Sequence, residues 1–431
     1  MALNPEEMKR RRQEKKLQQQ KQAAARKKLL IRLAIAVGVL LVCGVLILVI
    51  ALGNKKPKEP EQPAQTPETS AEQTPEASAE QTQPQKETTV IHLAAAGDLN
   101  VTDNTVAAGG ATYNYTDTFL DVAHLLAHAD VSVVNFEGGL YGDPFGKATA
   151  SAPQSMMEAL ASAGVDLVQL ANSYSINDGV SGLRDTINGV YLAGMEPLGV
   201  YADSAAFHES KGFTMRNVNG IKVAFVAFTK GMDGMALPSG SEKCVNVLYT
   251  DYSSTYQNVD TAGISAVMDA VASAKPDVTV VMVHWGSEFN DTISSSQTKI
   301  VELLQSKGAD AIIGTHSHYV QQMKLNPDTG NFVAYSLGDF FGDASRAGSE
   351  YSVVLDLEIT KNHETGETKI TDFSYTPIFT VTPKDQPARV VRIHEAMEAY
   401  DNLYLERVDT ATYEAMAYAL TRIEARINPE T

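Results

Sequence analysis

The sequence predicts an α/β fold, a mixed-sheet α/β/β/α sandwich, preceded by a single transmembrane helix. Short apolar runs alternate with helix-like segments between residues 90 and 318, which is typical of parallel strands with flanking helices. After Tyr319, strand-like runs follow one another across short turns, which indicates antiparallel pairing. An uncharged run of twenty residues, Leu33–Leu52, precedes these elements and is long enough to cross a bilayer.

The N-terminal region predicts an anchor and a stalk rather than part of a globular core. Residues 1–32 carry eleven Lys or Arg and three Asp or Glu, and this basic segment before Leu33–Leu52 places the N-terminus in the cytoplasm. A cleaved signal peptide ending near Gly53 is the alternative, although the apolar run and the basic segment are longer than such leaders need. Residues 53–89, rich in Pro, Glu, Gln and Thr, predict a disordered stalk. We therefore expect a single-pass protein of the cell membrane with an extracytoplasmic main domain.

The charge balance and the cysteines narrow the class of protein further. Because residues 1–32 carry +8 of a net charge of −17, the remaining residues carry −25. This excess of negative charge argues against nucleic acid as a partner. Cys43 falls in the predicted span and Cys244 in a predicted loop, so no disulfide within the chain is expected.

The main domain is predicted over residues 90–380, and a helical extension over residues 381–431. Its strands are short apolar runs, whereas its helices show apolar residues three or four positions apart. Asn219-Gly220 predicts a type I′ hairpin, and Gly194 is the expected end of a helix. Parallel strands are predicted over Val90–Ala96, Val131–Val134, Val165–Leu170, Val278–Val283 and Ala311–Ile313. The two strands of the hairpin are predicted over Phe213–Val218 and Ile221–Phe228, and later antiparallel strands over Tyr319–Leu325, Phe332–Ser336, Tyr351–Thr360 and Lys369–Tyr375. Helices are predicted over Asp117–Ala129, Gln154–Ala163, Asn177–Ala193 and Thr261–Ala274, and C-terminal helices over Gln386–Pro429, where Tyr404–Arg407 and Tyr413–Ile427 are amphipathic.

Metal-binding residue types follow several of the predicted strands. His284 ends one apolar run, while His316 and His318 come shortly after its neighbour. Asp98 and Glu137 stand just past two earlier strands. Because the carboxyl ends of parallel strands meet at one edge of a sheet, we expect these side chains to converge. Imidazole and carboxylate together suit Zn, Mn or Fe, and this set is large enough for much of a two-metal site.

Six short motifs along the chain carry a family resemblance. They are Ala96-Gly97-Asp98, Val134-Asn135-Phe136-Glu137, Leu170-Ala171-Asn172, His284-Trp285-Gly286-Ser287-Glu288, Gly314-Thr315-His316-Ser317-His318 and Tyr335-Ser336-Leu337-Gly338-Asp339-Phe340. In this order and spacing, Ile91 to about Tyr375 resembles the bacterial CapA proteins, which are linked to poly-γ-glutamate capsule synthesis. The resemblance implies a fold like that of calcineurin-like metallophosphoesterases and a divalent metal cofactor, with one or two ions. It also implies a cell-envelope polymer of poly-γ-glutamate type and capsule synthesis or export proteins as partners.

The chain departs from the family pattern at two places. The family has Leu-Ala-Asn-Asn-His, in which related metallophosphoesterases use the second Asn as a metal ligand and the His as a candidate general acid. Here Ser173 and Tyr174 occupy those positions, and Asn172 remains. The usual Asn of the last motif is Asp339. A serine hydroxyl is a weaker ligand than an amide, and tyrosine, with a pKa near 10, is not tuned like histidine for proton transfer.

Three functions therefore remain open. The first is a metal-dependent hydrolase or transferase, with Asp98, Glu137, His284, His316 and His318 as metal ligands and with Tyr174 and His316 as candidate catalytic residues. The second is a catalytically degenerate domain that binds a polymer or serves as a scaffold in the envelope machinery. The third is a secreted nucleotidase-like phosphoesterase. Arg184, Lys230 and Arg346 are candidate contacts to an anionic polymer, although surface solvation is the alternative for each.

Overall fold

The computed structural model describes residues 87–429, apart from residues 345, 384–385 and 402–407. The predicted basic segment, the transmembrane helix and nearly all of the predicted stalk lie outside the described residues. Within the described part, no helix is both long and apolar enough to cross a membrane.

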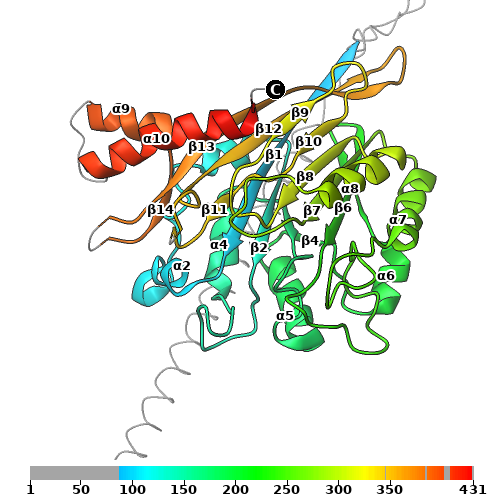
Figure 1. Ribbon diagram of the computed structural model, residues 1–431, viewed down its shortest axis with the longest axis horizontal. Helices are drawn as coiled ribbons and strands as arrows, with labels where there is room; N and C mark the ends of the chain where they lie inside the picture. The colour runs from blue at the N-terminus through cyan, green and yellow to red at the C-terminus, as the bar shows by residue number, and fades with distance from the viewer. Residues whose placement is uncertain (1–86, 345, 384–385, 402–407, 430–431) are drawn as a thin grey trace, which may run out of the picture. The chain divides into compact units, whose positions relative to one another are not determined.

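The first of two mixed sheets has the strand order β14-β13-β12-β1-β2-β3-β4, with β11 paired to β1 (Figure 1). β1 to β4 run parallel to one another, whereas β12 to β14 extend the sheet in antiparallel pairs. The strands are β1 (Thr88–Asn100), β2 (Val131–Glu137), β3 (Leu167–Gln169), β4 (Glu196–Leu198), β11 (Asp339–Phe341), β12 (Tyr351–Asn362), β13 (Thr368–Val381) and β14 (Arg389–Arg392).

The second sheet has the order β5-β6-β7-β8-β10-β9. Its central strands are parallel, and its first and last pairs are antiparallel. Asn219 and Gly220 both have positive φ between β5 and β6, which confirms the predicted type I′ hairpin. The strands are β5 (Thr214–Val218), β6 (Ile221–Thr229), β7 (Val278–His284), β8 (Ala311–Thr315), β9 (Met323–Leu325) and β10 (Phe332–Ala334).

Side-chain alternation along the second sheet explains the layering. On β7, Val280 and Met282 pack into the core shared with the first sheet, whereas Val281 and Val283 pack under α7 and α8. Helices α9 and α10 lie along β12 and β13 of the first sheet (Figure 1). The helices are α2 (Asp103–Ala107), α3 (Ala123–Ala127), α4 (Gln154–Ser162), α5 (Gly179–Leu192), α6 (Ser204–Ser210), α7 (Thr261–Ala274), α8 (Ser295–Ser306), α9 (Ile393–Asp401) and α10 (Thr410–Ile427), with a short 3₁₀ turn at Gly110–Thr112.

Two elements differ from the sequence-based expectation for one shared reason. The helix predicted over Asp117–Ala129 is reduced to α3, and β14 forms where only helix was predicted. The Thr118 carbonyl accepts a hydrogen bond from the Val390 amide at 2.9 Å, and the Asp121 carbonyl accepts one from Arg392 Nε at 2.9 Å. In a longer helix, both carbonyls would accept hydrogen bonds from helical amides four residues later. They bind β14 instead, so the first turns of the predicted helix do not form.

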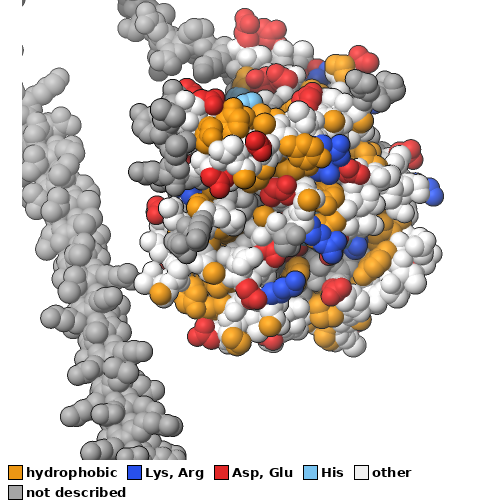
Figure 2. All heavy atoms as spheres, turned by 60° about the vertical axis from the view of Figure 1, so that its left-hand side comes forward, with side chains coloured by type: hydrophobic (Ala, Val, Ile, Leu, Met, Phe, Trp, Pro, Cys, Tyr) orange, Lys and Arg blue, Asp and Glu red, His pale blue; other side chains and the backbone are white. Residues whose placement is uncertain are grey.

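Charged side chains are mixed with apolar ones on the surface. Acidic side chains are spread over the face in Figure 2, and basic side chains lie between them. The net negative charge of the chain is therefore not gathered into one patch on that face.

The junction of β1 and β11 depends on a residue without a side chain. A Cβ on Gly97 would lie 1.8 Å from the Gly338 carbonyl oxygen, whereas the Asp98 amide donates to that oxygen at 2.9 Å. We expect Gly97→Ala to lower the free energy of unfolding by about 3 kcal/mol, because backbone must move. Gly308→Ala is the control, since its Cβ would meet nothing and its positive φ alone costs about 1 kcal/mol. Urea titration measures both values, and equal losses would contradict the steric argument.

Candidate metal centre

The polar ends of four strands meet at one edge of the two sheets. Asp98 and Glu137 lie within the last residues of β1 and β2, and His284 is the last residue of β7. His316 and His318 follow β8. The structure thus brings together all five sequence-predicted ligands. It adds a sixth buried group from the family motifs, Asp339, which is the register partner of Asp98 in the β1–β11 pair.

The six residues form two triads whose ligand atoms lie within 4.8 Å of one another in each triad. The carboxylate-rich triad contains Asp98, His318 and Asp339. In it, His318 Nδ1 is 2.7 Å from Asp339 Oδ1 and 3.7 Å from Asp98 Oδ2. Asn100 Nδ2 also donates to Asp339 Oδ1, at 2.9 Å. Two carboxylates and one imidazole are a donor set that suits Mn or Fe as well as Zn.

The histidine-rich triad contains Glu137, His284 and His316. His284 Nδ1 lies 3.4 Å from Glu137 Oε1, and the His284 and His316 ring centroids are 4.4 Å apart. The same combination of two histidines and one glutamate holds catalytic zinc in several hydrolases. The triad could therefore bind a divalent transition metal.

One asparagine and one backbone amide join the triads. Asn135 Nδ2 donates to Asp98 Oδ1 at 2.7 Å and to Glu137 Oε1 at 3.2 Å. The His316 amide donates to Asp98 Oδ2 at 2.9 Å. Each contact connects a residue of one triad to a residue of the other, so the triads are neighbours in one centre.

The state of His316 fits a metal ligand. Its two ring nitrogens are buried and have no hydrogen-bond partner, an arrangement that costs free energy unless another group binds there. His316 and His318 also have positive φ values of 88° and 59°, a strained backbone that is typical of functional loops. A cation between Asp98, Glu137 and Asp339 would moreover reduce the mutual repulsion of three buried carboxylates.

Burial and mutual charge shift the pKa values throughout the centre. Burial is the largest cause that raises the pKa of Asp98 to about 7 and the pKa of Glu137 well above its ordinary value. Burial lowers the pKa values of His284 and His316 well below the ordinary value, and nearby cations add to the effect. Both imidazoles are therefore neutral at pH 7, the form that binds metal. Burial also opposes protonation of His318, but the carboxylates of Asp339, Glu137 and Asp98 outweigh it and raise that pKa.

Metal binding is expected to release protons and to weaken as the pH falls. Asp98, with its pKa about 7, must lose its proton to act as a carboxylate ligand, and protonated His318 must become neutral. Below pH 7 protons occupy both groups, so we expect Mn²⁺ affinity to fall by about tenfold per pH unit for each displaced proton below pH 7, and less steeply for the Asp98 proton between pH 8 and pH 7. Calorimetry in buffers of different ionisation enthalpy counts these protons. An affinity that stays constant over this range would contradict the expectation.

The loop with the atypical Ser173-Tyr174 pair lies against the histidine-rich triad. Ser173 Oγ is 3.1 Å from His284 Nε2. The Asn172 amide group cannot replace it without breaking contacts, because its Nδ2 donates to Phe136 O at 2.6 Å and its Oδ1 accepts from the Tyr174 amide at 2.9 Å. Burial, with the charges of Glu137 and other carboxylates, raises the pKa of Tyr174 above its ordinary value. Tyr174 therefore holds its proton more tightly than a solvent-exposed tyrosine.

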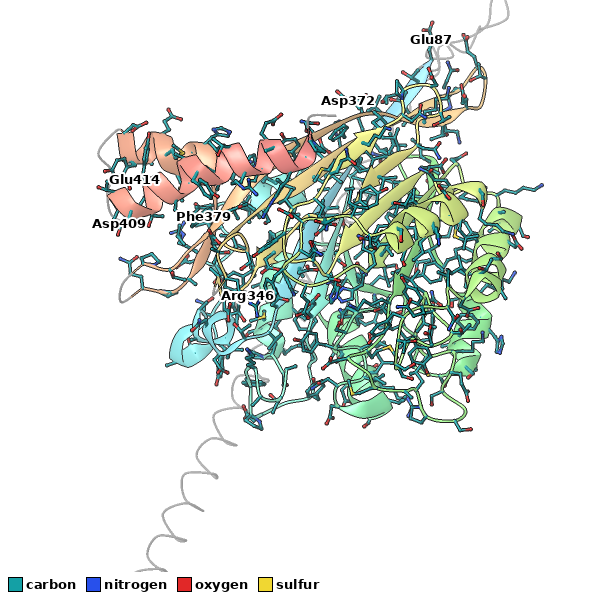
Figure 3. All side chains as sticks on the ribbon, in the orientation of Figure 1. Glu87, Arg346, Asp372, Phe379, Asp409 and Glu414 are labelled. Carbon is teal, nitrogen blue, oxygen red and sulfur yellow. The ribbon has the colours of Figure 1, made fainter. Side chains whose placement is uncertain are left out.

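Two of the three candidate basic residues lie at the centre. The Lys230 amide donates to the His284 carbonyl at 2.8 Å, and its Nζ donates to Gly286 O at 3.0 Å. The Arg346 guanidinium lies 4.1 Å from the centroid of Phe289, whose ring stacks on His318 at 4.8 Å (Arg346 is labelled in Figure 3). Arg184 instead donates from Nε to Ala202 O at 2.7 Å.

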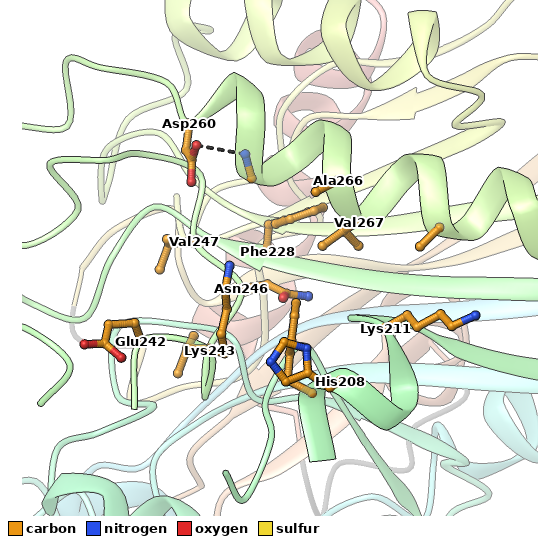
Figure 4. Close-up of a pocket in the computed structure, with 14 residues that line it drawn as sticks. His208, Lys211, Phe228, Glu242, Lys243, Asn246, Val247, Asp260, Ala266 and Val267 are labelled. Atoms are coloured by element: carbon orange, nitrogen blue, oxygen red, sulfur yellow. Dashed lines mark hydrogen bonds between the residues drawn. The ribbon is translucent and has the colours of Figure 1, made fainter. Parts of the chain in front are cut away.

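The centre is distinct from the cavity between α6 and α7. That cavity has a volume of about 340 Å³, and its lining includes the apolar Phe228 and Val267 and the basic Lys211 and Lys243 (Figure 4). None of the six triad residues lines it.

A comparison with protein families now identifies the chain. The model described as bacterial capsule synthesis protein PGA_cap matches residues 92–344. The chain belongs to this family. The match includes all six triad residues and ends five residues after Asp339, so the whole centre lies within the family region. The resemblance to CapA proteins is confirmed.

Relatives of the PGA_cap family member described here include two bacillar proteins. The chain is 27% identical over 218 residues to the capsule biosynthesis protein CapA of Bacillus anthracis, covering 49% of this chain and 48% of that protein. It is 27% identical over 230 residues to the PGA biosynthesis protein CapA of Bacillus subtilis, covering 53% and 51%. The chain thus spans about half the length of the curated relatives it matches.

Solved structures similar to this family member include a phosphatase and a nucleotidase. A phosphatase from Mycoplasma pneumoniae aligns with a TM-score of 0.41 and 15% identity, covering 68% of this chain and 94% of that one. The 5′-nucleotidase of Candida albicans aligns with a TM-score of 0.39 and 11% identity, covering 78% and 57%.

Proposed function

We propose that the chain is a membrane-anchored, extracytoplasmic protein that acts in the synthesis or export of an anionic cell-envelope polymer of poly-γ-glutamate type. We further propose that its buried centre is a metal-dependent hydrolase or transferase site. Family membership supports the first proposal, together with the names of the two bacillar relatives. The pair of adjacent triads, and above all the unpartnered imidazole of His316, supports the second.

The residues of the centre suggest a division of labour. Glu137, His284 and His316 would hold one ion, and Asp98, His318 and Asp339 would hold the other. Divalent ions at paired sites, when bound, supply Lewis acidity toward the attacking and leaving oxygens of a displacement. Asn135 would keep the Asp98 and Glu137 carboxylates oriented, because it donates to both.

Lys230 and Arg346 are the residues that we expect to attract an anionic substrate. Lys230 is partly buried, and its charge is felt at His284 and His316. The Arg346 guanidinium lies over the ring of Phe289, and that ring stacks on His318. A buried or stacked cation acts on a charged substrate more strongly than one in bulk water, because the local dielectric is lower. These two cations would offset the repulsion between an anionic polymer and an acidic domain.

A specific observation favours the second candidate function, a polymer-binding or scaffold domain without turnover. The Ser173 hydroxyl stands beside His284 where the family pattern has an amide ligand, and Tyr174 stands in place of the candidate general acid. Hydroxyl oxygen is a weaker neutral ligand, so the histidine-rich triad would bind its ion less tightly.

Counting metals separates the two candidates. The full-length chain, purified in mild detergent, is loaded with Mn²⁺, desalted and submitted to elemental analysis. Hydrolysis of bis(p-nitrophenyl) phosphate is measured on the same sample. About two ions per chain with hydrolysis would support an enzyme with a two-metal site. One ion or none, without hydrolysis, would reject the enzymatic proposal in favour of the binding role.

The anchoring proposal has its own test. It is motivated by the uncharged run Leu33–Leu52 and the basic residues before it. A protease added to intact cells, after removal of any outer barrier, should degrade the main domain and leave only a fragment around the span. A main domain that stays protected until the cells are lysed would overturn the orientation.

A further inference from the structure

A cavity on the outer face of the first sheet gathers histidines that the metal centre does not use. It has a volume of about 340 Å³. Three of the nine histidines of the chain line it, together with Asp356. We call these four residues the outer histidine cluster: His92, His124, His128 and Asp356. None of the six triad residues lines this cavity.

Sheet register brings two members of the outer histidine cluster together. Ala94 on β1 pairs with Asp356 on β12, so His92, two residues before Ala94, is the diagonal neighbour of Asp356 on the same face. α3 packs against β1 and β2 and carries His124, and His128 is its C-cap residue. His124 and His128 stand one helical turn apart, with the His128 amide donating to the His124 carbonyl at 3.1 Å. Their ring centroids are 6.4 Å apart.

The contact between His92 and Asp356 prepares one imidazole as a ligand. His92 Nδ1 lies 3.0 Å from Asp356 Oδ2 and 3.2 Å from Asp356 Oδ1. A carboxylate at this distance holds the ring proton on Nδ1 and leaves the lone pair on Nε2. Histidines that bind metals commonly have the same support from a carboxylate.

His124 of the cluster also has the form that binds metals. Burial is the first cause, and the Arg392 cation the second, that lower the pKa of His124, so its ring is neutral at pH 7. Arg392 itself donates to the Asp121 carbonyl and pairs with Glu395, whose carboxylate partly offsets its charge near the cavity. Both His124 and His128 are exposed, so rotation of their side chains toward a shared ion meets little packing resistance.

We propose that the outer histidine cluster binds one divalent transition metal ion, Zn²⁺, through the imidazoles of His92, His124 and His128. Three nitrogen ligands and one water complete the tetrahedral set that zinc prefers. A donor set of imidazoles selects Zn²⁺, Cu²⁺ or Ni²⁺ over Mg²⁺ and Ca²⁺, which prefer oxygen. The site is separate from the two triads and does not depend on the proposed hydrolase activity.

Zinc counting by equilibrium dialysis of the full-length chain tests the proposal. His124→Gln/His128→Gln should bind one Zn²⁺ fewer per chain than the parent. The matched control, His208→Gln/His363→Gln, removes two histidines that lie outside both the cluster and the triads and should bind as many ions as the parent. Unfolding temperatures in EDTA verify that both variants fold. Equal zinc content in the parent and the His124→Gln/His128→Gln variant would overturn the proposal.

Chemical protection gives a second, residue-resolved measurement. Diethylpyrocarbonate modifies free imidazoles, and mass spectrometry locates the modified residues. Saturating Zn²⁺ should slow modification of His92, His124 and His128 together by at least about tenfold, because bound nitrogens cannot react. Mg²⁺ should leave the rates unchanged. Unchanged rates with Zn²⁺, or protection of His124 and His128 without His92, would reject the three-histidine site.

Discussion

Replacing His316 by alanine is expected to empty the histidine-rich triad of metal and to remove the hydrolysis that depends on it. His316 supplies one of the two imidazoles in that triad, and the Ser173 hydroxyl beside His284 is a weaker ligand that would not replace it. Loss of groups that merely orient a ligand costs about 10–100-fold in affinity or activity. Loss of a ligand itself should exceed that range, and elemental analysis with bis(p-nitrophenyl) phosphate hydrolysis measures both effects.

Two controls make the His316→Ala result specific. His208→Ala removes an exposed histidine at the α6–α7 cavity and should leave metal content and hydrolysis unchanged. Unfolding in EDTA verifies that the His316→Ala chain remains folded without metal. A folded His316→Ala chain that keeps the metal content and the hydrolysis rate of the parent would contradict a ligand role for His316.

Restoring the family pattern with Ser173→Asn/Tyr174→His is expected to strengthen the histidine-rich triad. An amide oxygen at position 173 would face His284, where the Ser173 hydroxyl now stands 3.1 Å from Nε2. We expect the affinity for the second ion to rise by about tenfold, which corresponds to about 1.4 kcal/mol. A histidine at position 174 can also donate a proton near neutral pH, so hydrolysis should rise by about 100-fold.

The single variants divide this effect between its two causes. Ser173→Asn alone should raise metal affinity. Tyr174→His alone should raise the hydrolysis rate only in the fraction of chains whose histidine-rich triad already holds an ion. Metal titrations and pH–rate profiles of the parent, the two single variants and the double variant distinguish these contributions. If the double variant neither gains metal nor hydrolyses faster, the Ser173-Tyr174 pair is not what limits the centre.

The strand ends of the centre were predictable because their causes are local. Val278–Val283 and Ala311–Ile313 are continuous apolar runs, and parallel strands of this kind place the residues that follow them at one edge. The structure bears this out for His284, His316 and His318. It likewise places Asp98 and Glu137 beside them, although both lie within their strands rather than after them.

The remaining parts of the centre depend on contacts between distant segments. Asp339 was visible in the sequence as a departure from the family pattern, but its pairing with Asp98 arises from a three-residue strand 241 positions later. Lys230 reaches the centre because β6 lies beside β7. Likewise, β14 displaces the first turns of a helix some 270 positions earlier. No periodicity in a local window encodes such pairings.

The two triads have a mechanical consequence, because each takes ligands from both sheets. Asp98, Asp339 and Glu137 come from the first sheet, and the three histidines come from the second sheet or the loop after it. Apolar contact between two layers is non-directional and resists sliding weakly, whereas coordination bonds fix distance and angle. Bound metals would thus crosslink the two sheets and fix their relative position. Metal affinity then depends on how the two sheets are aligned. A substitution in the core between the sheets, far from any ligand, should therefore lower metal affinity before it has other effects.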